Sequence, residues 1–544
     1  MATKCKSRKS GKSCKSRPAF LGKPQGVIQP RVQKVGPEHF GIVAVDCALA
    51  RSKWMFCDFY GRVLLPPKNV EHTRSDLQLA IAEIDQASTQ YDIRDRIVAV
   101  EMTGTYHLPV KRAFRQAGWD TRLVHPFSSH HYLLPANPDN KTDDNDLEAI
   151  FRAAVNGFGL VEPACDETYQ TLKYLVRARR DLVEKRSRLH CQIREHLQRC
   201  LPGYGALFPD DELWTSPVAL RIARRAASAE AIRQTGIPGL TRWLREDRCR
   251  FQSRTVERVV AWAGNAAPAD PLAPMLTRLW QKLDDDRQTK TQQILEMERE
   301  IAGFLVHTPY LLLLSHPGIN VVSAGELAGE MGPIEHYANA KAITGRAGLF
   351  PSRYQSDEVD RADGPLARFR NHLLRAVWLR VASNLVKCNA HYRGMAQLWK
   401  LREVDARDIR TRIANRATRP IFHMVSGRKL YEHPSRLDRG YVLDKLRQFH
   451  LDHQTPPQQI LRDLQHAIKQ LPPEAYPQEA EPLQQAYQKN RRSRRSGPVH
   501  IGEILLATLA RLRVLELEST ESEAQGPARS CPTHEPDNVV VPMG

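Results

Sequence analysis

Two short apolar runs that each end in an acidic residue constrain this chain more than any other feature. Gly41-Ile-Val-Ala-Val-Asp46 and Arg96-Ile-Val-Ala-Val-Glu101 have the length of β-strands and are apolar almost throughout. A strand that is apolar on both faces is usually central in its sheet and covered by helices. The two runs therefore predict central strands of one sheet, each with an acid at its carboxyl end.

The segments around these runs carry alternating strand and helix patterns. Further strands are predicted at 52–60, 62–65 and 121–124, and helices at 75–87, 106–117 and 143–155. Strands followed by alternating strands and helices are typical of a mixed α/β domain. Because ligands collect at the carboxyl ends of strands in open α/β sheets, we expect Asp46 and Glu101 to share one site. For either acid alone, a structural carboxylate satisfied by its neighbours is the better interpretation.

A pair of acids on the third helix favours a metal site over that interpretation. Asp143 and Asp146 are three residues apart, so both can project from one helix face, and Thr142 or Asp143 can cap the helix. Four carboxylates that meet without cations would repel one another. Hard oxygen ligands select Mg²⁺ or Mn²⁺, and two such ions can stabilise the attacking and leaving oxygens of a phosphodiester displacement. Asp144 lies on another helix face and is left out of the predicted site.

The charge balance favours a polyanionic partner. The 544 residues include 80 Lys and Arg against 61 Asp and Glu, giving a formal net charge of +19. A basic surface gains free energy by releasing counterions from phosphates, although charge alone does not separate an enzyme from a ribosomal-type basic protein. No run approaches the roughly 20 apolar residues of a membrane span, and the ten cysteines include no CxxC pair. A cytoplasmic, nucleoid-associated protein without a membrane partner is expected.

The chain organisation follows from changes in composition. Residues 1–38 are predicted to be a disordered basic arm and 39–165 the α/β domain. Leucines at helical spacing predict two long helices that pack as an antiparallel coiled-coil arm within 166–310. A mainly α-helical domain is expected at 311–450, followed by a polar, partly disordered extension at 451–544.

The acidic motifs resemble those of a known family. Gly41-Ile-Val-Ala-Val-Asp46, Glu101-Met-Thr-Gly-Thr-Tyr-His107, His125-Pro126 and Lys141-Thr-Asp-Asp-Asn-Asp146 are similar in order and spacing to the DEDD transposases of insertion sequences, the group numbered one hundred and ten. The resemblance implies an RNase H-like (RuvC-like) fold with metal bound by Asp46, Glu101, Asp143 and Asp146. The family usually has a lysine where this chain has Leu49, and Arg51 or Lys53 is the candidate substitute.

A second block resembles the C-terminal transposase domain of the same family. It runs Ala347-Gly-Leu-Phe-Pro-Ser-Arg-Tyr-Gln-Ser356, and the family's reactive serine falls on Ser356, with Ser352 as the nearest competitor. Asp357 replaces the usual glycine, and the basic helix that follows is expected to retain Arg368, Arg370, Asn371 and Arg375. Before this block, Pro317-Gly318-Ile319-Asn320 opens a helix whose N-terminus suits a DNA phosphate and equally suits an ordinary turn.

The resemblance implies a site-specific DNA recombinase of a mobile element. Ser356 would attack a phosphate held by the metal-bound acids and give a covalent serine–DNA intermediate. The resemblance also implies DNA element ends and target as partners, a structured guide RNA, and assembly as homodimers and homotetramers. Two alternatives stay open: a RuvC-like endonuclease in which metal-activated water cuts the strand, and a non-catalytic nucleic-acid-binding protein.

Overall fold

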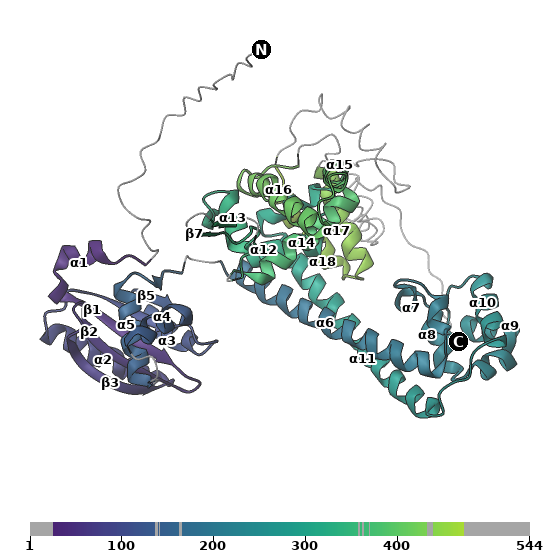
Figure 1. The fold of residues 1–544 in the computed structure, drawn as a ribbon, viewed down its shortest axis with the longest axis horizontal. Coiled ribbons are helices and arrows are strands. Elements are labelled where there is room, and N and C mark those ends of the chain that lie inside the picture. The colour runs from purple at the N-terminus through teal and green to yellow at the C-terminus, as the bar shows by residue number, and fades with distance from the viewer. Residues whose placement is uncertain are drawn as a thin grey trace, which may run out of the picture. The chain divides into compact units, whose positions relative to one another are not determined.

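The computed structural model describes residues 26–472 apart from 137–139, 141, 163–165, 357–358, 362–363, 369 and 432–438. The chain forms two compact units, Met1–Ala164 and Cys165–Gly544 (Figure 1). The first unit is a mixed α/β sheet domain and the second is mostly helical, as the sequence predicted.

The first unit is built on one six-stranded sheet in the order β3-β2-β1-β4-β5-β6. The strands are β1 (Phe40–Cys47), β2 (Arg51–Asp58), β3 (Val63–Glu71), β4 (Asp95–Glu101), β5 (Thr121–Val124) and β6 (Gly159–Leu160). Strands β1, β2 and β3 form an antiparallel meander, and β4 and β5 then run parallel to β1. The two apolar runs of the sequence are thus neighbours at the centre of the sheet.

Helices cover both faces of this sheet because the central strands are apolar on both sides. Val43, Val45, Val98 and Val100 face α2 (Arg74–Gln90) and α3 (His107–Gln116) in one buried cluster. Ile42, Ala44, Ile97 and Ala99 lie in a second cluster, together with residues of α5 (Asp143–Val155). Side chains alternate between faces along a strand, so each strand contributes to both layers.

The predicted disorder of residues 1–38 is wrong for its last third. Residues 1–25 lie outside the described residues, but α1 (Gln29–Val35) is helical and belongs to the first unit. Ile28 and Val32, four residues apart, are both buried against the sheet. The Nε of Arg31 also donates to Asp95 Oδ2 at 2.9 Å. The two buried apolar side chains and the ion pair offset the entropy cost of ordering this segment, although its composition is mostly polar.

Two long antiparallel helices form an arm in the second unit, as predicted. They are α6 (Glu167–Cys200) and α11 (Ala273–Leu305), and Figure 1 shows them side by side. Ion pairs mark the direction of packing: Arg199 near the end of α6 meets Asp270 just before α11, whereas Arg179 meets Glu298 towards the other end.

Four short helices between α6 and α11 form what we call the arm head, residues 201–272. They are α7 (Glu212–Thr215), α8 (Ala219–Arg225), α9 (Ala229–Glu246) and α10 (Ser253–Gly264). The arm head shares its own hydrophobic core with the adjoining ends of α6 and α11, including Tyr204, Leu240 and Trp280.

A larger core at the other end of the arm joins the arm to the rest of the chain. Its helices are α12 (Val321–Met331), α13 (Ala340–Ala347), α14 (His372–Cys388), α15 (Ala390–Lys400), α16 (Ala406–Ser426), α17 (Arg439–Asp452) and α18 (Pro457–Gln470). The extension predicted from residue 451 is therefore wrong up to 471, because Ile460, Leu464 and Ala467 of α18 are buried in this core. Residues 473–544 lie outside the described residues. Within the described ranges, no helix is both long and apolar enough to span a membrane.

Candidate active site

The two strand-end acids lie side by side on one face of the sheet. The last residues paired between β1 and β4 are Val45 and Val100, and Asp46 and Glu101 each follow directly. Both acids share the face of Ala44, two residues before Asp46, because side chains alternate along a strand. This is the face that α5 covers, and both acids are half-buried there.

The N-terminus of α5 adds two further acids to this position. Thr142 caps the helix, its Oγ1 accepting from the backbone N–H of Asn145 at 3.3 Å. Acids in the first turn are favoured by the helix dipole. Burial, followed by the charges of Glu101, Asp146 and Asp143, raises the pKa of Asp46 to about 6. The other three acids predicted from the sequence therefore lie close enough to Asp46 for their charges to act on it.

Glu101 is held by two hydroxyl groups. Thr103 Oγ1 donates to Oε2 at 3.1 Å, and Ser129 of α4 (Pro126–Ala136) donates to Oε1. Among the residues that the structure describes, no three His, Cys, Asp or Glu side chains stand in an arrangement that could ligate one metal ion. The donor set is nevertheless of the hard oxygen type that Mg²⁺ and Mn²⁺ prefer, and its mutual repulsion is what a divalent cation relieves.

A lysine from the neighbouring strand lies against the acids, which sequence reasoning had left open. Lys53 of β2 pairs with Asp46 in the strand register, and its Nζ lies 2.6 Å from Asp144 Oδ1. Asp144, Asp143 and Asp46 all raise the pKa of Lys53, the hydrogen bond to Asp144 most strongly. Leu49, at the position where the resembled family has lysine, is 74% exposed. The basic group beside the acids therefore comes from position 53.

The predicted serine lies in a β-hairpin of the second unit. Ser356 ends β7 (Tyr354–Ser356) and its backbone pairs with Val359 of β8 (Val359–Arg361). The competitor Ser352 is exposed, and its backbone bonds to Pro365 and Gly364, which follow β8 in the chain.

The basic residues after this hairpin have a structural part. Arg375 of α14 donates from Nε to the carbonyl of Ala347 at 3.0 Å and also bonds to the carbonyl of Ala367, so it fastens the base of the hairpin. Asn371 caps α14 by accepting from the N–H of Leu374 at 3.0 Å. Arg368 and Arg370 precede the helix instead of lying on it, which corrects the sequence expectation.

The turn before α12 is an ordinary capped helix start. Asn320 Oδ1 accepts from the N–H of Ser323 at 2.8 Å, and Ser323 Oγ accepts from the N–H of Asn320 at 2.9 Å. Val321, at the first turn, is 1% exposed. The capping box satisfies two N–H groups at this helix start, and the first turn is buried, which favours the alternative of an ordinary turn.

Two models of known protein families match separate parts of the chain. Residues 43–202 match the model of the DEDD transposases of the IS110 type, described as "Transposase", and residues 310–397 match the model described as "Transposase IS116/IS110/IS902 family". No curated protein matches the chain significantly. The two matches, one over the acidic sheet domain and one over the serine hairpin, define a DNA transposase, an enzyme of the recombinase class. Domains of the kind found in IS110-family transposases of insertion sequences are thus matched in two parts of this chain, and as a transposase it binds DNA.

Proposed function

We propose that this transposase cuts and rejoins DNA at the four-acid site, with Asp46, Glu101, Asp143 and Asp146 holding Mg²⁺ or Mn²⁺. The observation that carries the proposal is the placement of Asp46 and Glu101 at adjacent strand ends, on the face where α5 begins with Asp143 and Asp146. The raised pKa of the half-buried Asp46 agrees with this placement. Such crowding is costly unless a cation neutralises it. When bound, the metal would activate a DNA phosphate towards displacement.

The strand order supports an RNase H-like fold for the first unit. An antiparallel meander of three strands, followed by two strands parallel to the first, is the arrangement expected from the family resemblance. In this arrangement β1 and β4 bring their carboxyl ends together, and α5 adds its first turn on the same face. Lys53 would then contact a phosphate oxygen or hold Asp144 away from the ligand set.

Ser356 is the proposed nucleophile. Its hydroxyl oxygen would attack the DNA phosphorus, its proton passing to solvent or a nearby base, while the DNA hydroxyl leaves. The resulting serine–phosphate ester would conserve bond energy until the hydroxyl of another strand displaces serine and restores the DNA backbone. The likeness to IS110-family transposases supports this covalent step. It also supports a structured guide RNA that selects target and donor, and assembly into dimers and tetramers on DNA in the nucleoid.

A nuclease that uses water is the second candidate function. The acids alone are sufficient for it, because a metal-activated water attacks phosphate without any covalent protein intermediate. The two candidates differ in one product, the protein–DNA adduct.

The deciding experiment uses a suicide DNA substrate whose cut strand cannot be rejoined. With Mg²⁺, the wild-type chain should run on a denaturing gel with one DNA strand attached. Ser356→Ala should bind DNA yet give no adduct, Ser352→Ala should still give it, and Asp46→Asn should neither cut nor form adduct.

Each other outcome has its own meaning. Adduct lost in Ser352→Ala but kept in Ser356→Ala would move the nucleophile by four residues. Cleavage without adduct in every variant would favour the water-using nuclease. Full cleavage by Asp46→Asn would refute the metal site.

A further inference from the structure

The middle of the arm has charged residues where a coiled coil normally has apolar ones. Positions of α6 that recur at alternating steps of four and three face α11, and they read Leu172, Val176, Arg179, Val183, Arg186, His190, Ile193 and Leu197. No residue of α6 between Val176 and Ile193 is buried. Arg179 is paired with Glu298 of α11 at 2.6 Å. The next charged positions, Arg186 and His190, lack such a partner in the described part of the chain.

Four basic side chains gather at this point and are called the arm basic cluster: Arg186, His190, Arg194 and Arg287. No described group accepts a hydrogen bond from the buried Nε of Arg186 or bonds to the buried Nε2 of His190. Burial first, and then Arg287, Arg186 and Arg194, lowers the pKa of His190 to about 4. The countercharges are shared: Glu298 acts on Arg186 but is paired with Arg179 and His453, and Arg287 shares Asp284 with Arg224. Asp211 acts more weakly on both Arg186 and His190.

An aromatic ring of the arm head lies inside this cluster. The indole of Trp214 stacks on the His190 ring with centroids 4.0 Å apart and an angle of 5° between the planes. The guanidinium carbons of Arg194 and Arg287 lie 5.5 Å and 5.6 Å from the same ring. The contacts with this ring hold the neutral imidazole and the two arginine side chains in fixed positions, so the two guanidinium charges stay beside the ring.

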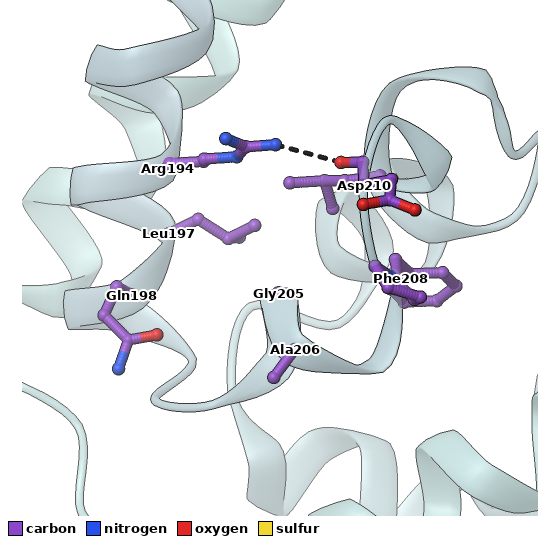
Figure 2. A pocket seen from close by; sticks show the side chains of 9 residues that line it. Arg194, Leu197, Gln198, Gly205, Ala206, Phe208 and Asp210 are labelled. Carbon is purple, nitrogen blue, oxygen red and sulfur yellow. Dashed lines mark hydrogen bonds between the residues drawn. The ribbon is translucent and has the colours of Figure 1, made fainter. Parts of the chain in front are cut away.

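A pocket of about 350 Å³ adjoins the cluster, and Arg194 belongs to both (Figure 2). Leu197, Phe208 and Leu213 form its floor but are buried in the arm-head core, and Gln198 adds a side-chain amide at its edge, so the accessible lining is part polar and part apolar. Arg194 Nη2 donates to the backbone carbonyl of Asp210 at 3.1 Å across the pocket. The volume is at the low end of the range of roughly 300–1,000 Å³ typical of small-molecule sites.

We propose that the arm basic cluster and this pocket bind single-stranded nucleic acid, with a phosphate on the cluster and one unstacked base in the pocket. Guanidinium groups bind phosphate oxygens with strong charge-assisted hydrogen bonds. A pocket of mixed lining, with an amide and an arginine at its edge, suits a base that has left its stack, because a base has an apolar face and a polar edge. The pocket wall contributed by residues 205–213 lies outside both matched segments, so the family models do not account for it. The proposal rests on the proposed function in that the partner is nucleic acid.

The unpaired arginine also makes the test clean. Arg186 is half-buried among like charges, so Arg186→Gln removes repulsion and desolvation and should melt no lower than the wild type. Arg188, two residues further along α6, is exposed and has the same charge, so Arg188→Gln is the matched control. Ala206 lines the pocket and is exposed, so Ala206→Trp obstructs the pocket without disturbing a core.

The measurement is fluorescence anisotropy of labelled single-stranded RNA, single-stranded DNA and duplex DNA with the full-length chain in EDTA. Arg186→Gln should weaken single-strand binding about tenfold and make the log–log salt dependence shallower by about 0.7, the value for one phosphate of a single strand. Arg188→Gln should stay within about twofold of the wild type. Ala206→Trp should weaken single-strand binding while leaving duplex binding unchanged, and the RNA and DNA probes show which strand is preferred.

Wild-type affinity and salt slope in both Arg186→Gln and Ala206→Trp would overturn the proposal and leave the cluster a structural feature or the docking site of an acidic protein. Equal weakening by Arg188→Gln would overturn it too, because general charge would then suffice. A chain that binds none of the probes would instead count against the proposed function itself.

Discussion

The raised pKa of Asp46 predicts that neutralising this residue stabilises the metal-free protein. The pKa of Asp46 rises from 3.8 to about 6, or roughly 2 units, and each unit corresponds to about 1.36 kcal/mol. The full product of about 3 kcal/mol must be reduced because Asp46 is only half-buried and solvent screens its neighbours. We therefore expect Asp46→Asn to raise the free energy of unfolding by about 1–2 kcal/mol without metal.

The pH dependence has a definite sign. A carboxyl group whose pKa is higher in the folded state binds its proton more tightly there, so ionisation favours unfolding. The destabilisation is fully present above about pH 6, fades as the pH falls through 6, and is gone below the unfolded value of 3.8. Since asparagine does not ionise, the advantage of Asp46→Asn should be greatest near neutral or higher pH and should vanish close to pH 4.

Calorimetry in EDTA provides the test. For a unit the size of Met1–Ala164, 1–2 kcal/mol corresponds to a rise in Tm of about 2–8 °C. Mn²⁺ should reverse the order by stabilising only the wild type, by about 2.7 kcal/mol at one hundred times Kd. Asp144→Asn is the control, because it breaks the pair with Lys53 and should bring no gain. If Asp46→Asn melted at or below the wild-type temperature in EDTA near pH 8, the crowding of the four acids would be refuted.

Two further contacts can be tested by substitution. Lys53→Met should slow strand cleavage at least about tenfold, because it removes the cation near Asp46 and Asp144. Lys53→Arg keeps a cation there and should retain most of the cleavage. If Lys53→Met cleaved as fast as the wild type on a sequencing gel, a role for Lys53 in cleavage would be excluded. Arg177→Met should lower the free energy of unfolding by about 2–3 kcal/mol, because Glu330, with a side chain 3% exposed, loses a bidentate partner at 2.8 and 3.0 Å. Adding Glu330→Gln to that variant should recover part of the loss in urea unfolding, and no recovery would mean that the buried charge is not the cause.

The central sheet could be predicted because its signals are local. The runs ending in Asp46 and Glu101 are β1 and β4, and the acid pair opens α5, as the patterns indicated. Local patterns could not predict whether each acid lies on the face of the sheet that α5 covers. The pairing of Val45 with Val100 decides that, and pairing is a long-range property.

Composition alone gave a wrong prediction for the segment that forms α18, where apolar residues at helical spacing are few. Residues 457–470 are rich in glutamine and begin with proline, a composition that predicts a polar extension. Ile460, Leu464, Ala467 and Leu471 recur at helical spacing, and all four are buried in α18 or directly after it. Proline at the start is favourable there, because the first helical position needs no N–H donor.

Lys53 could be named as a candidate from the sequence, but choosing it required the register of the β1–β2 hairpin. Lys53 comes seven positions after Asp46, and the tight turn between β1 and β2 brings the two residues opposite each other. The sequence offered Arg51 and Lys53 equally, since a shift of two residues keeps both on one face. The contact of Lys53 with Asp144 distinguishes them.

The arm shows how a correct fold prediction can miss chemistry. The leucine stripe that predicted α6 includes Leu182 and Leu189, which are only half-buried and flank the seam. The seam positions next to them include Arg186 and His190, and the charge of Arg287 acts on both. Apolar packing at the two ends of α6 is sufficient to hold it against α11, which is why a hydrophobic pattern finds the arm. A seam whose centre repels itself gains nothing in stability from its charges. An anionic ligand would supply the missing counterion, which makes the weakest part of the coiled coil the part most suited to binding.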